Sequence, residues 1–130
     1  FHFGISEDNI REILTNCSIK LLDVRSKRIP PGLDDKILTS WNSLMITAFA
    51  KGYRVTNQTK YLDAAKNCIF FIEKNLLDED KLLRTYKNNT AKIDGYLEDY
   101  SYFANALLDV FEIEPESKYL DLSLKWDAIW

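Results

Sequence analysis

The sequence has few of the residues that carry metal or redox chemistry. It holds two cysteines and one histidine among 130 residues. Cys17 and Cys68 lie far apart, and neither has a neighbour with which to form a zinc or redox motif. His2 lies beside the amino terminus, where chains fray, so we do not expect it to be catalytic. These features predict no metal site, no cofactor and two buried, reduced thiols, with a disulfide between them as the alternative.

Long apolar runs and an excess of positive charge are also missing. No run approaches the ~20 apolar residues that a membrane-spanning helix needs, and no signal-peptide pattern is present. The chain has 17 basic and 20 acidic residues, a net charge of −3, and the two signs alternate along it. This composition argues against nucleic acid or a membrane as a partner. We expect a cytoplasmic protein.

The composition that remains is that of a folded protein. Hydrophobic residues make up 46% of the chain and charged residues 28%, which is ordinary for a globular domain. The length suits one compact domain with a hydrophobic core. The chain starts at Phe1 rather than at a methionine and stops at Trp130 within an amphipathic pattern. We therefore expect a single domain over 1–130 that is a fragment of something larger.

The opening segment, over 1–32, has apolar residues at helical spacing. Ser6 is placed to cap its amino terminus, with two acidic residues following in the first turn. Thr15 is placed to cap a second helix, so a break near Thr15-Asn16 is expected. The sequence Pro30-Pro31-Gly32 ends the segment.

Two helical hairpins are predicted to follow, over 33–77 and over 96–130. In the first, a helix capped by Thr39 or Ser40 is apolar on nearly every side, which indicates burial all round. Its amphipathic partner begins at Thr59 and ends near Leu77. In the second hairpin, an apolar helix from about Leu97 precedes one that is capped by Ser117 and runs to the end of the chain.

The period changes between these hairpins, over 78–95. In "KLLRTYKNNTAKIDGY", apolar and polar residues alternate, which is typical of strands. Asn88-Asn89 suits a tight turn, because asparagine tolerates the left-handed conformation. The pattern predicts one short β-hairpin.

An internal repeat relates the two helical hairpins. The tetrapeptide KYLD occurs at Lys60–Asp63 and again at Lys118–Asp121. The same shift along the sequence aligns the apolar helix that precedes each copy. It also aligns the predicted caps Thr59 and Ser117. Each unit is thus an apolar helix followed by an amphipathic one, the pattern of an α/α toroid. We therefore predict a mainly α fold: a partial α/α toroid of antiparallel helical hairpins, with one short β-hairpin.

Three stretches, "PGLDDKILTSWNSLMI", "LLRTY" and "GYLEDYSYFANALLDVFE", resemble the thioredoxin-like spermatogenesis-associated protein family. The resemblance begins near Ile5 and covers nearly all of the chain. It implies a longer protein, in which an amino-terminal thioredoxin-like domain precedes an (α/α)6 toroid similar to N-acylglucosamine 2-epimerases and six-hairpin glycosidases. The Cys-x-x-Cys motif of that thioredoxin-like domain is not in this sequence, so no redox chemistry is carried over.

Acidic, amide and aromatic residues gather where the two apolar helices begin. By the internal repeat, Ser40, Trp41 and Asn42 align with Glu98, Asp99 and Tyr100, and in a toroid such helix ends line one mouth of the central cavity. Candidate catalytic residues are Asp35, Glu98 and Asp99, since glycoside hydrolysis uses paired carboxylates. Candidate substrate-binding residues are Asp34, Trp41, Asn42, Arg84 and Tyr100, and Tyr96 could also stack on a sugar.

Each of these residues also has a purely structural interpretation. The acids can cap helices or pair with Lys36 and Arg84, and the aromatic rings can belong to the core. The function predicted for the full-length protein is carbohydrate-related binding or processing, with a sugar-like molecule as partner. The alternative is a protein-interaction or structural platform without catalysis. The chain alone is expected to be inactive, and to self-associate through the Tyr119–Trp130 or the Ile10–Val24 face.

Overall fold

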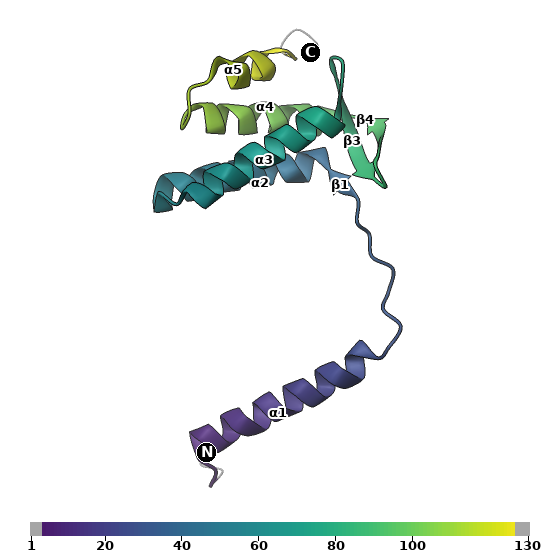
Figure 1. Ribbon diagram of the computed structural model, residues 1–130, viewed down its shortest axis with the longest axis vertical. Coiled ribbons are helices and arrows are strands. Elements are labelled where there is room, and N and C mark those ends of the chain that lie inside the picture. Colours follow the sequence, from purple (N-terminus) through teal and green to yellow (C-terminus); the bar gives the residue numbers. More distant parts are fainter. Residues whose placement is uncertain (1–3, 127–130) are drawn as a thin grey trace. The chain divides into compact units, whose positions relative to one another are not determined.

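The structure is a computed structural model that describes residues 4–126, and it is mainly helical (Figure 1). The chain divides between Asp34 and Asp35 into two compact units, each of which is described by itself. That residues 1–130 form one domain of a larger toroid stays a prediction. Among the helices of residues 4–126, none combines the length and the apolarity that a membrane crossing requires.

The first unit contains one continuous helix, α1 (Glu7–Ser26). The predicted cap is confirmed, because the Ser6 hydroxyl accepts a hydrogen bond from the Asn9 amide at 3.3 Å. The predicted break near Thr15 is wrong. The Thr15 hydroxyl donates to the carbonyl of Arg11 at 2.8 Å, one turn back within the helix, so it caps nothing. Cys17 is exposed on α1, which contradicts the prediction that both thiols are buried.

The second unit contains the two predicted helical hairpins. The first pairs α2 (Thr39–Thr56) with α3 (Thr59–Asn75), and the second pairs α4 (Leu97–Phe111) with α5 (Ser117–Leu124). The final helix ends at Leu124, and positions 127–130 of its predicted extent lie outside the described residues. The mainly helical fold predicted from the periodicity is confirmed.

The predicted side-chain caps of the second unit are wrong, although the helices begin where expected. The N-cap residues are Leu38, Gln58 and Glu116, and none of their side chains caps a helix. The Thr39 hydroxyl instead donates to the Leu83 carbonyl at 2.6 Å. That hydrogen bond holds the start of α2 against the sheet. The Thr39 hydroxyl therefore makes a tertiary contact instead of capping its own helix.

Most of a small antiparallel sheet lies between the hairpins along the chain, and one short strand of it precedes α2. Its longest strand, β3 (Lys81–Lys87), pairs with β1 (Ile37–Leu38), β2 (Leu77–Asp78) and β4 (Thr90–Asp94). Strands β3 and β4 form the predicted hairpin, and Asn88 and Asn89 take φ values of 50° and 57° at its turn. The two-residue strands β1 and β2 were not predicted, because they are too short to show a period.

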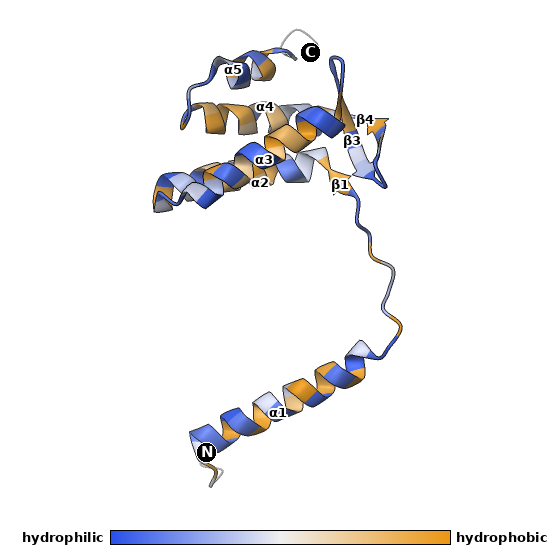
Figure 2. Cartoon of the chain, viewed as in Figure 1, coloured by the Kyte–Doolittle hydropathy of each residue, from blue (hydrophilic) through white to orange (hydrophobic). Residues whose placement is uncertain are grey.

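The core of the second unit lies between the helices and the inner face of β3. Figure 2 shows α4 as largely hydrophobic, whereas apolar and polar residues alternate around α1. Helix α2 buries one face only, and Trp41 and Met45 are 68% and 48% exposed, so burial on all sides is wrong. The buried hydrophobic residues are Ile46, Ala50, Ala65, Ile69, Ile72, Leu76, Leu82, Phe103, Ala106, Leu107, Val110, Tyr119 and Trp126.

Trp126 lies on the Tyr119–Trp130 face that was expected to self-associate, but it is covered within the chain, as is Tyr119. The side chain of Trp126 is 3% exposed, and its indole N–H donates to the Asp80 carbonyl at 2.9 Å. Its ring centroid lies 5.5 Å from that of Tyr100 and 6.0 Å from that of Phe103. The chain after α5 therefore folds back beneath the β2–β3 turn. Leu124 on the same face is 52% exposed, and positions 127–130 of that face lie outside the described residues.

Candidate functional site

The two inner helices, α2 and α4, run in the same direction and begin side by side. Three side-chain contacts advance together along both helices: Ser40 with Asp99, Thr47 with Asp109, and Arg54 with Glu112. Helix starts present unpaired backbone N–H groups and a partial positive charge. The internal repeat had placed the same two helix starts in register, and the contact between Ser40 and Asp99 shows that they do lie side by side. That this end is a functional site stays a prediction.

Asp99 joins these helix starts from a fully buried position. One carboxylate oxygen accepts a hydrogen bond from the Ser40 amide at 2.9 Å. The other accepts from the Tyr96 amide at 2.9 Å and from the Arg84 guanidinium at 3.0 Å. Both oxygens are thus held by the protein, which favours a structural role for this acid.

Arg84, on β3, is the charged centre of the site. Its guanidinium donates to Glu98 at 2.7 Å as well as to Asp99, and it lies 4.4 Å from the ring centroid of Tyr96. The hydrogen bond to Glu98 raises the pKa of Arg84 above its ordinary value, and the charge of Asp99 acts in the same direction. Arg84 therefore makes the ion pairs that the structural interpretation predicted, within reach of solvent.

A broad, open depression of about 560 Å³ surrounds the exposed edge of this ion pair. Tyr96 and Tyr102 are 56% and 40% exposed, and the Glu98 side chain is 47% exposed. Tyr102 was not among the residues predicted to line a site. The signal was present, because Tyr102 follows Glu98 by four positions on a helix and so shares its face. The depression is lined by Arg84, Tyr96, Leu97, Glu98, Ser101 and Tyr102.

Three predicted binding residues lie elsewhere. The Tyr100 hydroxyl accepts from the Leu82 amide at 3.0 Å, and its ring packs against Trp126 in the core. The Asn42 amide group donates to the Leu38 carbonyl at 2.8 Å, and the Cys68 thiol lies 3.7 Å from its oxygen. Burial raises the pKa of that thiol. Trp41 is exposed in the first turn of α2 but does not line the depression.

The predicted acids do not converge on one point. Asp35 pairs with Lys87 at 2.5 Å, an interaction that lowers the pKa of Asp35, whereas Glu98 and Asp99 share Arg84. Asp34 is exposed in the first unit. Within residues 4–126, no group of three or more His, Cys, Asp or Glu side chains could hold a metal ion. A catalytic role for Asp35, Glu98 or Asp99 stays a prediction.

Comparison with solved structures defines the class of protein. The chain is similar to cellobiose 2-epimerase from Bacillus thermoamylovorans, with a TM-score of 0.65 and 15% identity. The match covers 73% of this chain and 28% of the epimerase chain. At that identity the likeness shows the fold alone, which is a portion of an epimerase-type α/α toroid.

Sequence comparison then identifies the relatives. The chain is homologous over most of its length to spermatogenesis-associated protein 20, as the resemblance predicted. It is 31% identical to the human protein and 30% to the rat protein over 95% and 98% of this chain. It is also 34% identical, over 94% of this chain, to the uncharacterized protein B0495.5 of Caenorhabditis elegans. In each case it spans 17% of the relative's length. No family model matches the chain.

Proposed function

We propose that this chain forms two neighbouring hairpins in the wall of an α/α toroid, and that the depression beside Arg84 binds a carbohydrate. One observation carries the proposal. The Arg84–Glu98 ion pair lies beside exposed tyrosine rings where the inner helices α2 and α4 begin. The ion pair of Arg84 and Glu98 and the rings of Tyr96 and Tyr102 all line the depression.

The chemistry of the lining suits a sugar. The C–H face of a pyranose packs on an aromatic ring, and its hydroxyl groups pair with planar charged groups. The half-exposed Glu98 carboxylate accepts from hydroxyl groups, while Arg84 donates. The Arg84–Glu98 and Arg84–Asp99 contacts hold the guanidinium in place before a ligand arrives. Such a preset geometry lowers the ordering cost of binding.

Binding without turnover is the activity we propose for the chain alone. Hydrolysis of a glycosidic bond uses two carboxyl groups on opposite sides of the bond. Of the described residues that line the depression, Glu98 is the one carboxylate, and Asp99 is buried beneath it. Further groups would have to come from other parts of a toroid wall.

The test is an NMR titration of the 130-residue chain with cellobiose and with N-acetylglucosamine. We expect amide shifts centred on Tyr96 to Tyr102, and an affinity loss of about fivefold in Tyr102→Ala, because one stacking contact contributes about 1 kcal/mol. The matched control is Tyr53→Ala, on α2 outside the depression. Shifts elsewhere, or equal affinity in both variants, would refute the proposal.

A protein-interaction role is the second candidate, and one observation favours it. Taken by itself, α1 buries none of its side chains, although eight large apolar residues lie on it or just before it. We propose a second copy of this chain as the partner. The exposed apolar residues are Ile5, Ile10, Ile13, Leu14, Ile19, Leu21, Leu22 and Val24.

A further inference from the structure

The depression beside Arg84 has a negative balance of charge. Among the described residues that line it, Arg84 is the cation and Glu98 the carboxylate, and Asp99 is buried against the same guanidinium. One positive charge therefore faces two negative ones, which leaves a net charge of −1 at the site. The two acids hold Arg84 at 2.7 Å and 3.0 Å, so its charge is already matched before a ligand arrives.

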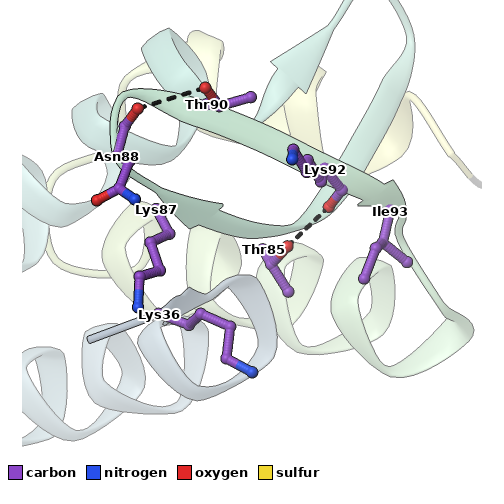
Figure 3. A pocket seen from close by; sticks show the side chains of 7 residues that line it. All are labelled: Lys36, Thr85, Lys87, Asn88, Thr90, Lys92 and Ile93. Carbon is purple, nitrogen blue, oxygen red and sulfur yellow. Dashed lines mark hydrogen bonds between the residues drawn. The ribbon is translucent and has the colours of Figure 1, made fainter. Parts of the chain in front are cut away.

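The strand register places the nearby lysines elsewhere. Arg84 and Thr85 are neighbours on β3, so their side chains point to opposite faces of the sheet. Thr85 pairs with Lys92, and both line a second hollow, of about 330 Å³, together with Lys87 (Figure 3). Lys87 and Lys92 are therefore not among the residues that line the depression.

The conformation of Ile93 leaves Arg84 uncovered. The β3–β4 register places Ile93 opposite Arg84, and opposite residues of a regular ladder share a face and pack together. Ile93 instead has a φ of 67°, and its side chain lines the second hollow beside Thr85 and Lys92 (Figure 3). Such a conformation is rare for a β-branched residue, and strain of this kind clusters at ligand sites. The guanidinium thus stays within reach of a ligand.

Glu98 and Tyr102 are placed to receive a cation together. They are four residues apart on α4, so they share one side of the helix, and both line the depression. The Glu98 side chain is 47% exposed, and its bond to Arg84 uses Oε1, so Oε2 is able to accept from a second donor. The face of a tyrosine ring attracts cations, as Tyr96 does with the Arg84 guanidinium at 4.4 Å. A carboxylate oxygen beside a phenol ring suits a small ammonium group.

We propose, on the basis of the carbohydrate binding proposed above, that the sugar bound in this depression carries a protonated amine. The ammonium group donates to Glu98, offsets the net negative charge and lies against the ring of Tyr102. A neutral sugar makes the hydroxyl and stacking contacts alone. A sugar acid meets two carboxylates and has to displace Glu98 from Arg84. Glu98 is thereby the residue that sets the preference among sugars.

The experiment compares glucosamine, glucose and glucuronic acid by NMR titration of the 130-residue chain at constant ionic strength. The titrations are made at about pH 6, where the amine is protonated and the carboxyl groups are ionised. We expect saturable amide shifts from Tyr96 to Tyr102 with glucosamine and with glucose. Glucosamine should bind about fivefold more tightly than glucose, since an exposed ion pair and a cation–π contact together give a gain of this size. Glucuronic acid should bind more weakly than glucose.

Glu98→Gln should bring the affinities for glucosamine and glucose to the same value. The matched control is Glu112→Gln. Glu112 makes a similar exposed ion pair, with Arg54, at the other end of α4, and it does not line the depression. This control should keep the preference for glucosamine.

The outcomes separate the amine from the carbohydrate binding on which it rests. If none of the three sugars shows saturable binding, both ideas are wrong. If glucose binds and glucosamine binds equally well, or if glucuronic acid binds more tightly than glucosamine, the amine alone is overturned. The same conclusion follows if Glu112→Gln loses the preference as fully as Glu98→Gln does.

Discussion

At the scale of single residues, Asp99 connects three segments with one carboxylate. It accepts hydrogen bonds from the Tyr96 amide at the start of α4 and from the Ser40 amide at the start of α2. It also accepts one from the Arg84 guanidinium, which extends from β3. Two of these donors are backbone amides at helix starts, which have no partner within their own helix. Removing Asp99 would therefore leave several buried donors unpaired at once.

We predict that Asp99→Ala lowers the free energy of unfolding by about 3–5 kcal/mol, the usual cost of removing one partner from a buried charge pair. Glu98→Gln is the matched control, because Glu98 bonds to the same guanidinium but is half exposed. It should cost less than about 1 kcal/mol. Urea denaturation of both variants measures the difference, and Asp99→Asn serves if the alanine variant does not fold. Equal losses at the two positions would contradict this account.

The sequence could not separate the roles of these two acids. Glu98 and Asp99 are adjacent and chemically alike, and about 100° of helix rotation decides which one is buried. The roles of Asn42 and Tyr100 were equally ambiguous from sequence. An amide or a phenol side chain can bind a ligand, cap a helix or form a hydrogen bond within the core. The internal repeat showed that the two helix starts lie in register, whereas the packing of β3 decided which side chains reach solvent there.

At the scale of secondary-structure elements, β3 decides how the helices meet. Its backbone binds Thr39 of α2 through Leu83 and Tyr100 of α4 through Leu82, and the Leu82 carbonyl also accepts from the Gly95 amide at 2.7 Å. The chain passes from β4 into α4 through Gly95. This crossing leaves little space, because a Cβ atom on Gly95 would lie 2.8 Å from the Leu82 carbonyl oxygen.

We predict that Gly95→Ala destabilises the second unit by about 1–3 kcal/mol, since backbone atoms must shift to admit the methyl group. Gly32→Ala is the control, because a Cβ there meets nothing within 4 Å. It should be neutral, or slightly stabilising through the unfolded chain. Thermal unfolding followed by circular dichroism compares the two. A neutral Gly95→Ala would mean that Gly95 and the backbone of β3 approach less closely than described.

The elements themselves were predictable to different degrees. Long helical segments such as α3 and α4 have a clear period, and Asn88-Asn89 specifies its hairpin locally. The strands β1 and β2 exist only because β3 lies beside them, so two residues of local sequence could not reveal them. The predicted cap Thr39 was wrong for the same reason, since its hydroxyl bonds to β3.

At the scale of the whole molecule, α1 carries an apolar stripe of Ile10, Leu14, Cys17, Leu21 and Val24, spaced alternately by four and three residues. This spacing keeps the stripe on one side of the helix. Charge is divided along α1 as well. The first turns hold three acids, Glu7, Asp8 and Glu12, with Arg11. At the other end Lys20 and Arg25, with Lys27 and Arg28 just beyond the helix, outweigh Asp23. An antiparallel pair of α1 helices would bring acidic ends against basic ends.

We predict that the chain self-associates through α1 in this antiparallel arrangement. Burial of each large apolar side chain contributes about 1.5–3 kcal/mol, and charge complementarity fixes the direction. Cys17 lies near the middle of the stripe, so the pairing brings two Cys17 thiols together. The oxidant diamide should then link them, taking up the two electrons and two protons that the thiols release. Sedimentation at micromolar concentration should show a dimer in the absence of oxidant.

Matched variants separate this pairing from other contacts. Cys68→Ser should still be cross-linked and Cys17→Ser should not, because Cys68 is partly buried in the second unit. Leu14→Glu should shift the sedimenting species to the monomer, whereas Leu33→Glu should not, since Leu33 is 83% exposed and lies beyond α1. A chain that remains monomeric and resists cross-linking would refute the pairing, and would mean that the stripe on α1 is covered from within the same molecule.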